Sequence, residues 1–143
     1  MMKPAGDELR PDGGQETSGY PRQEQLIDVR RVDRPDAVVV AVSGAVDVLT
    51  APRLRSALAV ALENLDGRPV VVDLVDVRFF GSPGLRALAE STEQAATKPG
   101  FEPLRVVVDS NRPVLRPIEL TGYDAILALY DDVEEAVSGN PLH

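Results

Sequence analysis

The 143-residue sequence contains no cysteine, no tryptophan and a single histidine. The absence of cysteine excludes disulfide bonds, thiolate metal sites and cysteine nucleophiles. The histidine is the last residue, His143, so the chain has no internal histidine for a Ser-His-Asp triad and too few histidines for a multi-histidine metal site. These absences remove most familiar enzyme classes. We expect a protein that is not an enzyme and that needs no cofactor or metal.

Positive charge is also scarce. The chain has 15 Lys and Arg residues against 23 Asp and Glu residues, which gives a formal net charge of −8. This balance argues against a nucleic-acid-binding protein, which needs a basic face for phosphates, and against docking on an anionic membrane. The N-terminus lacks the apolar stretch of a signal peptide, and no run approaches the roughly 18 apolar residues of a membrane span. We therefore expect a cytoplasmic protein.

The composition changes near residue 24. Residues 1–24 contain prolines, glycines and scattered charge but few apolar residues, a pattern that predicts a disordered tail. Regular apolar patterns begin at about residue 25. We predict that residues 25–143 form one folded domain.

Strand and helix patterns alternate through this second part of the chain. Apolar runs, many of them rich in valine, predict five strands at residues 26–32, 37–42, 70–80, 104–108 and 125–130. Apolar residues at helical spacing predict four helices. The first spans residues 51–65, and the second runs from Ser82 toward Lys98. The third is capped by Ser110 or Asn111 and ends at Gly122, and the fourth spans residues 133–137 after a cap at Asp131 or Asp132.

The connections between these elements predict the topology. Helical crossovers join the later strands, so these should pair in parallel, whereas a short turn should place the first strand antiparallel at an edge. The fold class is therefore α/β, with a mixed, mostly parallel sheet of about five strands and about four helices.

One segment, residues 79–85, joins a strand to a helix with an unusual sequence. The pattern alone favours a turn in which Ser82 is the N-cap and Pro83 takes the first helical position. Phe80 stands where a nucleophile elbow needs glycine, and no P-loop lysine follows Gly84, which argues against a hydrolase and against nucleotide binding by that route. Partners often meet such folds at the carboxyl ends of parallel strands. Ser82 is therefore a candidate to receive a phosphoryl group from another protein.

A second strand end lies at residues 43–50. There Asp47 is expected to fix the turn, and Thr50 is expected to cap the following helix. The two strand ends should lie side by side, because their strands are central in the predicted sheet. Asp73 and Asp76 are expected to bond amide groups rather than to bind metal.

Four segments together resemble a known family. They are Gly44-Ala45-Val46-Asp47 with Thr50-Ala51, Val70-Val71-Val72-Asp73-Leu74 with Val77 and Phe79-Phe80, Gly81-Ser82-Pro83-Gly84-Leu85, and Leu120-Thr121-Gly122-Tyr123 with Tyr130-Asp131-Asp132-Val133-Glu134-Glu135-Ala136. In the same order, these segments look like the family's Gly-Glu-Leu-Asp motif with Thr-Ala, its central strand, its Asp-Ser-Ser/Thr-Gly-Leu motif and its C-terminal third. The chain from about residue 27 to residue 137 thus resembles the STAS domain, and most closely the bacterial anti-sigma factor antagonists.

The resemblance implies a STAS-like sandwich and a partner-switching mechanism. The unphosphorylated antagonist binds an anti-sigma factor that is also an ATP-dependent serine kinase, and this binding releases the sigma factor. The kinase then phosphorylates the first serine of the motif, the complex separates, and a serine phosphatase resets it. That serine matches Ser82. The implied contact surface around it comprises Asp47, Thr50, Gly81, Pro83 and Gly84.

Three positions differ from the family pattern, since Gly81 replaces an Asp, Pro83 replaces the second Ser/Thr and Ala45 replaces a Glu. Gly81 removes a carboxylate, and Pro83 removes one N–H that could hold a phosphate. Two alternatives therefore stay open. One is a non-phosphorylated, constitutive antagonist or scaffold, and the other is a STAS module that senses a small molecule or nucleotide.

Overall fold

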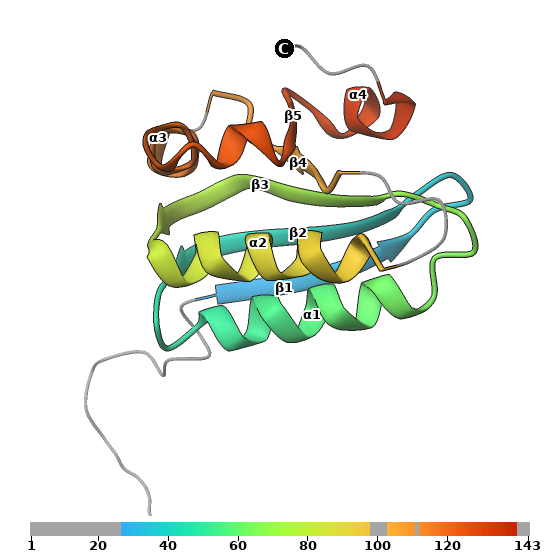
Figure 1. The fold of residues 1–143 in the computed structure, drawn as a ribbon, viewed down its shortest axis with the longest axis horizontal. Coiled ribbons are helices and arrows are strands. Elements are labelled where there is room, and N and C mark those ends of the chain that lie inside the picture. Colours follow the sequence, from blue (N-terminus) through green and yellow to red (C-terminus); the bar gives the residue numbers. More distant parts are fainter. Residues whose placement is uncertain (1–26, 98–102, 111, 140–143) are drawn as a thin grey trace, which may run out of the picture.

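The computed structural model describes residues 27–97, 103–110 and 112–139 (Figure 1). The strands are β1 (Ile27–Asp33), β2 (Val38–Val46), β3 (Val70–Phe80), β4 (Arg105–Val107) and β5 (Ala128–Tyr130). The helices are α1 (Ala51–Glu63), α2 (Ser82–Ala95), α3 (Arg112–Thr121) and α4 (Val133–Ser138), with a 3₁₀ turn at Tyr123–Ala125. The predicted tail, residues 1–24, and His143 lie outside the described residues.

The five strands form one sheet in the order β1-β2-β3-β4-β5. β1 pairs with β2 antiparallel at the edge, and the other three pairings are parallel. Each helical crossover thus moves the chain to the next position in the sheet. The mixed, mostly parallel topology confirms the fold class predicted from the strand and helix patterns.

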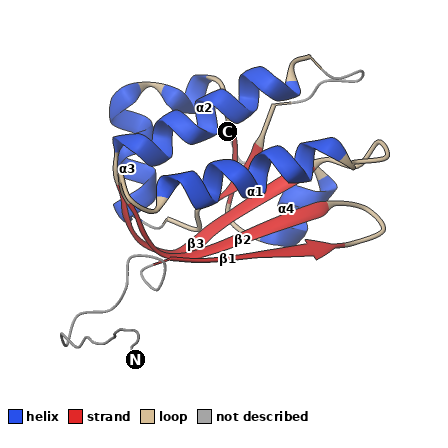
Figure 2. Ribbon diagram, turned by 90° about the horizontal axis from the view of Figure 1, so that it is seen from below, coloured by secondary structure: helices blue, strands red, loops and turns tan. Residues whose placement is uncertain are grey.

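Helices cover both faces of the sheet (Figure 2). α1, α2 and α3 pack on one face, where the larger hydrophobic core contains Leu54, Leu58, Leu88 and Ile118. On the opposite face, Ala136 of α4 joins a smaller core with strand residues that include Val39, Val71, Val107 and Tyr130. The alternation of side chains along β2 and β3 explains why these valine-rich strands supply both cores.

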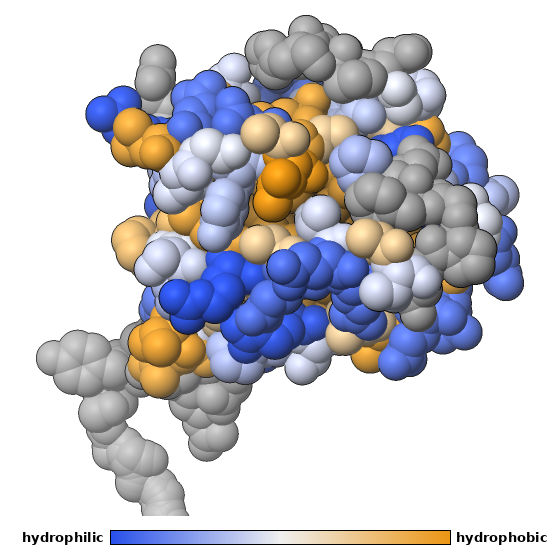
Figure 3. Space-filling model, in the orientation of Figure 1, coloured by the Kyte–Doolittle hydropathy of each residue, from blue (hydrophilic) through white to orange (hydrophobic). Residues whose placement is uncertain are grey.

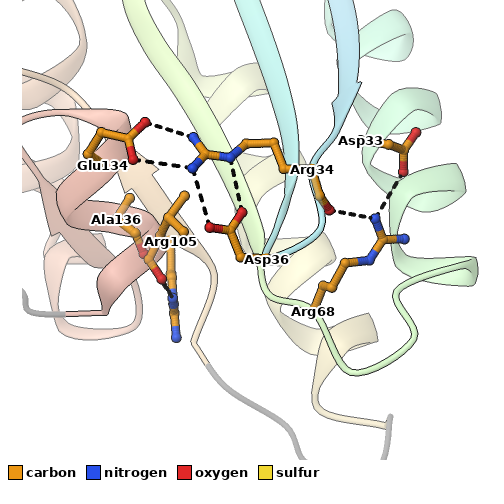
Figure 4. Close-up of polar contacts among 8 residues, drawn as sticks. Asp33, Arg34, Asp36, Arg68, Arg105, Glu134 and Ala136 are labelled. Atoms are coloured by element: carbon orange, nitrogen blue, oxygen red, sulfur yellow. Dashed lines mark hydrogen bonds and ion pairs between the residues drawn. The ribbon is translucent and has the colours of Figure 1, made fainter.

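Salt bridges tie α4 to the turn between β1 and β2 (Figure 4). The guanidinium of Arg34 donates to Glu134 of α4 at 2.8 Å and to Asp36 at 3.0 Å. Arg68, which precedes β3, donates to the main-chain oxygen of Arg34 at 3.0 Å. This charged cluster lies at the end of the sheet where β2 and β3 begin, because Val38 pairs with Val70.

Several predicted boundaries are wrong. β2 runs four residues past its predicted end, because Ser43, Gly44 and Ala45 still pair with β3. The last strand is only Ala128–Tyr130, because a 3₁₀ turn takes the chain from Tyr123 to Ala125.

Two predicted helix ends are confirmed. Gly122, in the left-handed region, follows α3, and Asp132 caps α4 by accepting the Glu135 N–H at 2.8 Å. For α3, the alternative cap Asn111 lies outside the described residues.

Candidate partner-binding site

The carboxyl ends of β2 and β3 lie side by side, as the sequence predicts. Val46 pairs with Phe80, and the Gly81 N–H donates to the Val46 oxygen at 2.9 Å. Two loops leave the sheet from this point, one leading to α1 and the other to α2. The residues of the two candidate segments therefore belong to one edge of the molecule.

The loop from β2 to α1 is held by a compact hydrogen-bond network. One carboxylate oxygen of Asp47 accepts the N–H groups of Leu49 and Thr50, at 2.9 and 3.0 Å. The Thr50 hydroxyl accepts the Asp47 N–H at 2.9 Å and donates to the Ala45 oxygen at 2.8 Å. Asp47 thus fixes the turn, as predicted.

The prediction that Thr50 caps α1 is confirmed for its position, because Thr50 is the N-cap residue of α1, but not for its side chain. Thr50 has φ −101° and ψ −21°, in the helical region, and its side chain makes no capping bond to the helix. A capping side chain usually starts from extended backbone, from which it can reach the N–H groups of the first turn. Thr50 is 1% exposed, and its hydroxyl instead ties the loop back to β2.

Ser82 lies exposed in the first position of α2. The prediction that Ser82 is the N-cap is wrong, because Gly81 occupies that place with extended backbone at φ −83° and ψ 178°. Pro83 then falls in the second helical position rather than the first. Within the described residues the Ser82 hydroxyl has no hydrogen-bond partner, so it is available to an external molecule.

Gly84 is buried where α2 crosses the ends of both strands. A Cβ at this position would lie 2.8 Å from Cγ1 of Val46 and 2.9 Å from Cε1 of Phe80. These distances are too short for any side chain without a shift of the packed core. Gly84 therefore sets how closely the N-terminus of α2, with Ser82 on it, approaches the sheet.

Three exposed apolar side chains near this edge were missed by sequence reasoning. Val48 is 71% exposed, Leu49 is 58% exposed and Phe79 is 54% exposed. Figure 3 shows apolar surface at the end of the molecule where α1 begins. The signal for Phe79 was present in the sequence, because consecutive strand residues such as Phe79 and Phe80 point to opposite faces of the sheet.

Phe79 also lies close to the cap of α2. A Cβ on Gly81 would lie 3.1 Å from Cε2 of the Phe79 ring and 3.5 Å from Cδ of Pro83. Gly81 thus leaves just enough room for an aromatic ring beside the candidate phosphoacceptor. The surface next to Ser82 is therefore apolar, whereas the Asp that the family pattern has in place of Gly81 would make it acidic.

Comparison with known proteins identifies the family. The STAS domain model matches residues 27–136. The chain belongs to the STAS domain family. Among curated proteins, the anti-sigma-F factor antagonist RsfB of Mycobacterium tuberculosis is 30% identical over 113 residues, which cover 79% of this chain and 88% of RsfB.

Solved STAS-type structures show the same fold. An anti-sigma factor antagonist from Mycobacterium paratuberculosis matches with a TM-score of 0.68 and 34% identity, over 78% of this chain and 92% of that chain. A STAS domain protein from Planctomyces limnophilus matches with a TM-score of 0.65 and 18% identity, over 77% of this chain and 94% of that one, and supports the fold alone. The STAS-like α/β fold predicted from the sequence is confirmed.

The carboxyl group of Asp73, in β3 of this STAS domain, bonds a main-chain amide as predicted. It accepts the Val75 N–H at 3.1 Å. Partial burial raises the pKa of Asp73, although this hydrogen bond lowers it, and the nearby carboxylate of Asp76 raises it further. No three His, Cys, Asp or Glu residues lie close enough to hold a metal ion in the part of the chain that the structure describes.

In the part of the chain that the structure describes, no helix has both the length and the apolar character that a membrane span requires.

Proposed function

We propose that this STAS protein is an anti-sigma factor antagonist that acts by binding and catalyses no reaction itself. It binds an anti-sigma factor through the edge where β2 and β3 end, and it thereby frees a sigma factor. The observation that carries the proposal is Ser82, exposed on the first turn of α2 at the same edge of the sheet as the exposed side chains of Leu49 and Phe79. The names of its relatives support the same function.

The residues around Ser82 have distinct roles in this proposal. Asp47 and Thr50 hold the neighbouring loop, so that Val48 and Leu49 are presented on a fixed backbone. Gly81, Pro83 and Gly84 shape the start of α2 beneath and beside Ser82. A prearranged surface of this kind loses little conformational entropy when a partner binds.

Phosphorylation of Ser82 by the anti-sigma factor is the proposed switch. The Ser82 oxygen attacks the γ-phosphorus of ATP, the bond to the β–γ bridging oxygen breaks, ADP leaves, and the hydroxyl proton passes to a base on the kinase. The new group carries close to two negative charges. Charge buried in an interface without a partner costs roughly several kcal/mol, and about 1.4 kcal/mol changes an affinity tenfold. The complex should therefore separate, until a serine phosphatase removes the group.

Binding measurements with substituted chains test the switch. We expect Ser82→Asp to weaken binding to the anti-sigma factor at least tenfold relative to Ser82→Ala, as measured by calorimetry with the purified partner. Ser138→Asp, on the exposed surface of α4, is a matched control that adds the same charge on the other face of the sheet. Equal affinities for Ser82→Asp and Ser82→Ala would contradict the switch.

The main-chain hydrogen bonds at the start of α2 favour a second candidate, a constitutive antagonist without phosphorylation. Pro83 has no N–H, and the N–H groups of Gly84 and Leu85 already donate to the Gly81 oxygen, at 2.9 and 3.3 Å. A phosphate on Ser82 would thus find few free amides. Absence of phosphate on Ser82, with the partner complex intact in the presence of ATP, would establish this candidate.

A further inference from the structure

The main chain at the start of α2 offers few hydrogen-bond donors to a phosphoryl group on Ser82. The first turn of a helix usually offers several free N–H groups to an anion. Here the Gly81 N–H donates to Val46, Pro83 has none, and the next two donate to the Gly81 oxygen. Among these groups, the N–H of Ser82 itself is the one left without an acceptor in the described structure.

Arg86 lies one helical turn beyond Ser82. Residues four apart lie on the same face of a helix, with their Cβ atoms about 5–6 Å apart. Ser82 and Arg86 are both exposed. The acidic residue one turn further on, Glu90, is already bound by Arg55 of α1 at 2.7 Å. In the part of the chain that the structure describes, Arg86 has no ion-pair partner.

We propose that the guanidinium of Arg86 binds the phosphoryl group of phosphorylated Ser82. This proposal deepens the proposed function and rests on phosphorylation at Ser82. The order is the favourable one, with the anion N-terminal to the cation at a spacing of four, and a planar guanidinium can donate two hydrogen bonds to one phosphate. Arg86 thereby takes over the role of the amides that are missing or occupied in the first turn.

The pair explains how one modification can change the docking edge without disturbing the fold. Before phosphorylation this turn of α2 presents the positive charge of Arg86. Afterwards the phosphate, with about two negative charges, outweighs Arg86, and the guanidinium is no longer free to contact the partner. The sign of the charge on the surface that meets the anti-sigma factor is reversed.

The test measures the ionisation of the phosphate directly. Phosphoserine is incorporated at position 82 by genetic encoding in the full chain, and its second pKa is followed by ³¹P NMR. We expect this pKa to be about 0.3 lower in the chain with Arg86 than in Arg86→Gln, because the cation favours the dianion. Arg86→Lys should keep part of the difference, and high salt should abolish it.

Arg78→Gln is the matched control, since Arg78 is exposed on β3 four residues before Ser82. It should leave the pKa unchanged. Equal pKa values with and without Arg86, or a larger change in Arg78→Gln, would overturn the proposal. Because the phosphate is built in, these outcomes do not depend on the kinase. Failure of the proposed function would appear separately, as the absence of a partner that phosphorylates Ser82.

Discussion

At the scale of single residues, the half-buried carboxyl group of Asp73 lowers the stability of the folded domain when it is charged. Its side chain lies in β3 between the pairing partners Ala41 and Val107, and it accepts one main-chain N–H. Burial raises its pKa and so favours the neutral form in the folded state. The neutral carboxyl therefore stabilises the fold at low pH, and this contribution is lost as the pH rises through the raised pKa.

Asp73→Asn should therefore stabilise the domain at neutral pH. The amide oxygen still accepts the Val75 N–H, and no charge has to be buried. We expect a gain of about 0.5 kcal/mol in the free energy of unfolding at pH 7, a small figure because the group is half exposed. Urea denaturation across pH 3–7 measures it, and the gain should shrink as the pH falls through the raised pKa and be absent below the ordinary Asp pKa of 3.8. The exposed Asp131→Asn serves as control. A pH-independent effect would show that the charge on Asp73 is not what lowers the stability of the domain.

At the scale of elements, the loop between β2 and α1 depends on one buried hydroxyl. Thr50 satisfies the Ala45 oxygen and the Asp47 N–H at once, at a position that solvent does not reach. A buried polar group left without its partner costs about 1–3 kcal/mol. The rigidity of the edge beside Ser82 thus rests on this side chain.

Thr50→Val, which keeps the shape but removes the hydroxyl, should lower the free energy of unfolding by about 1–3 kcal/mol. Thr50→Ser should restore most of the loss. Thr92→Val is the control, because the Thr92 hydroxyl donates only to the Leu88 oxygen within α2. The midpoints of urea unfolding measure the stabilities of all three variants. A Thr50→Ser variant as unstable as Thr50→Val would show that packing, and not the hydroxyl, matters here.

At the opposite end of β2 and β3, an ion pair between Arg34 and Glu134 adds to the apolar contacts that hold α4 on the sheet. Hydrogen bonding to Arg34 lowers the pKa of Glu134 below its ordinary value of 4.5. The stabilisation from this pair is therefore present above about pH 4.5 and is lost as the pH falls through the lowered pKa. α4 should loosen in acid before the central strands do.

Arg34→Gln should expose the amides of α4 to faster hydrogen exchange at pH 6 while the amides of β2 and β3 stay protected. The variant should also lose the acid dependence of α4 protection. Arg31→Gln removes an exposed pair with Asp33 that does not involve α4, and it should leave the exchange unchanged. Equal exchange of α4 in the wild type and in Arg34→Gln would show that the pair between Arg34 and Glu134 does not hold it.

These elements also show what the sequence could predict. The order of strands and helices and the antiparallel edge follow from periodicity and connection lengths, which are local properties. The place of Ser82 relative to the helix does not, because Gly81 is drawn into the cap by its bond to Val46, a residue far away in the sequence. The close contact of Gly84 with Val46 and Phe80 is likewise set by tertiary packing.

At the scale of the whole molecule, the two ends of the parallel strands differ in character. The end where β2 and β3 begin carries salt bridges around Arg34, whereas the other end carries Ser82 and several exposed apolar side chains. This asymmetry fits a protein that binds through one edge and is stabilised at the other. The proposed switch, Ser82, lies at the apolar edge.

The most direct test of this switch is intact-mass analysis of the wild-type chain and of Ser82→Ala after incubation with ATP and extract of the source cells. The anti-sigma factor is captured in parallel. We predict one phosphate on the wild-type chain, none on Ser82→Ala, and no phosphorylated chain in the captured complex. A phosphate that persists in Ser82→Ala, or a phosphorylated wild-type chain that stays bound to its partner, would contradict the account.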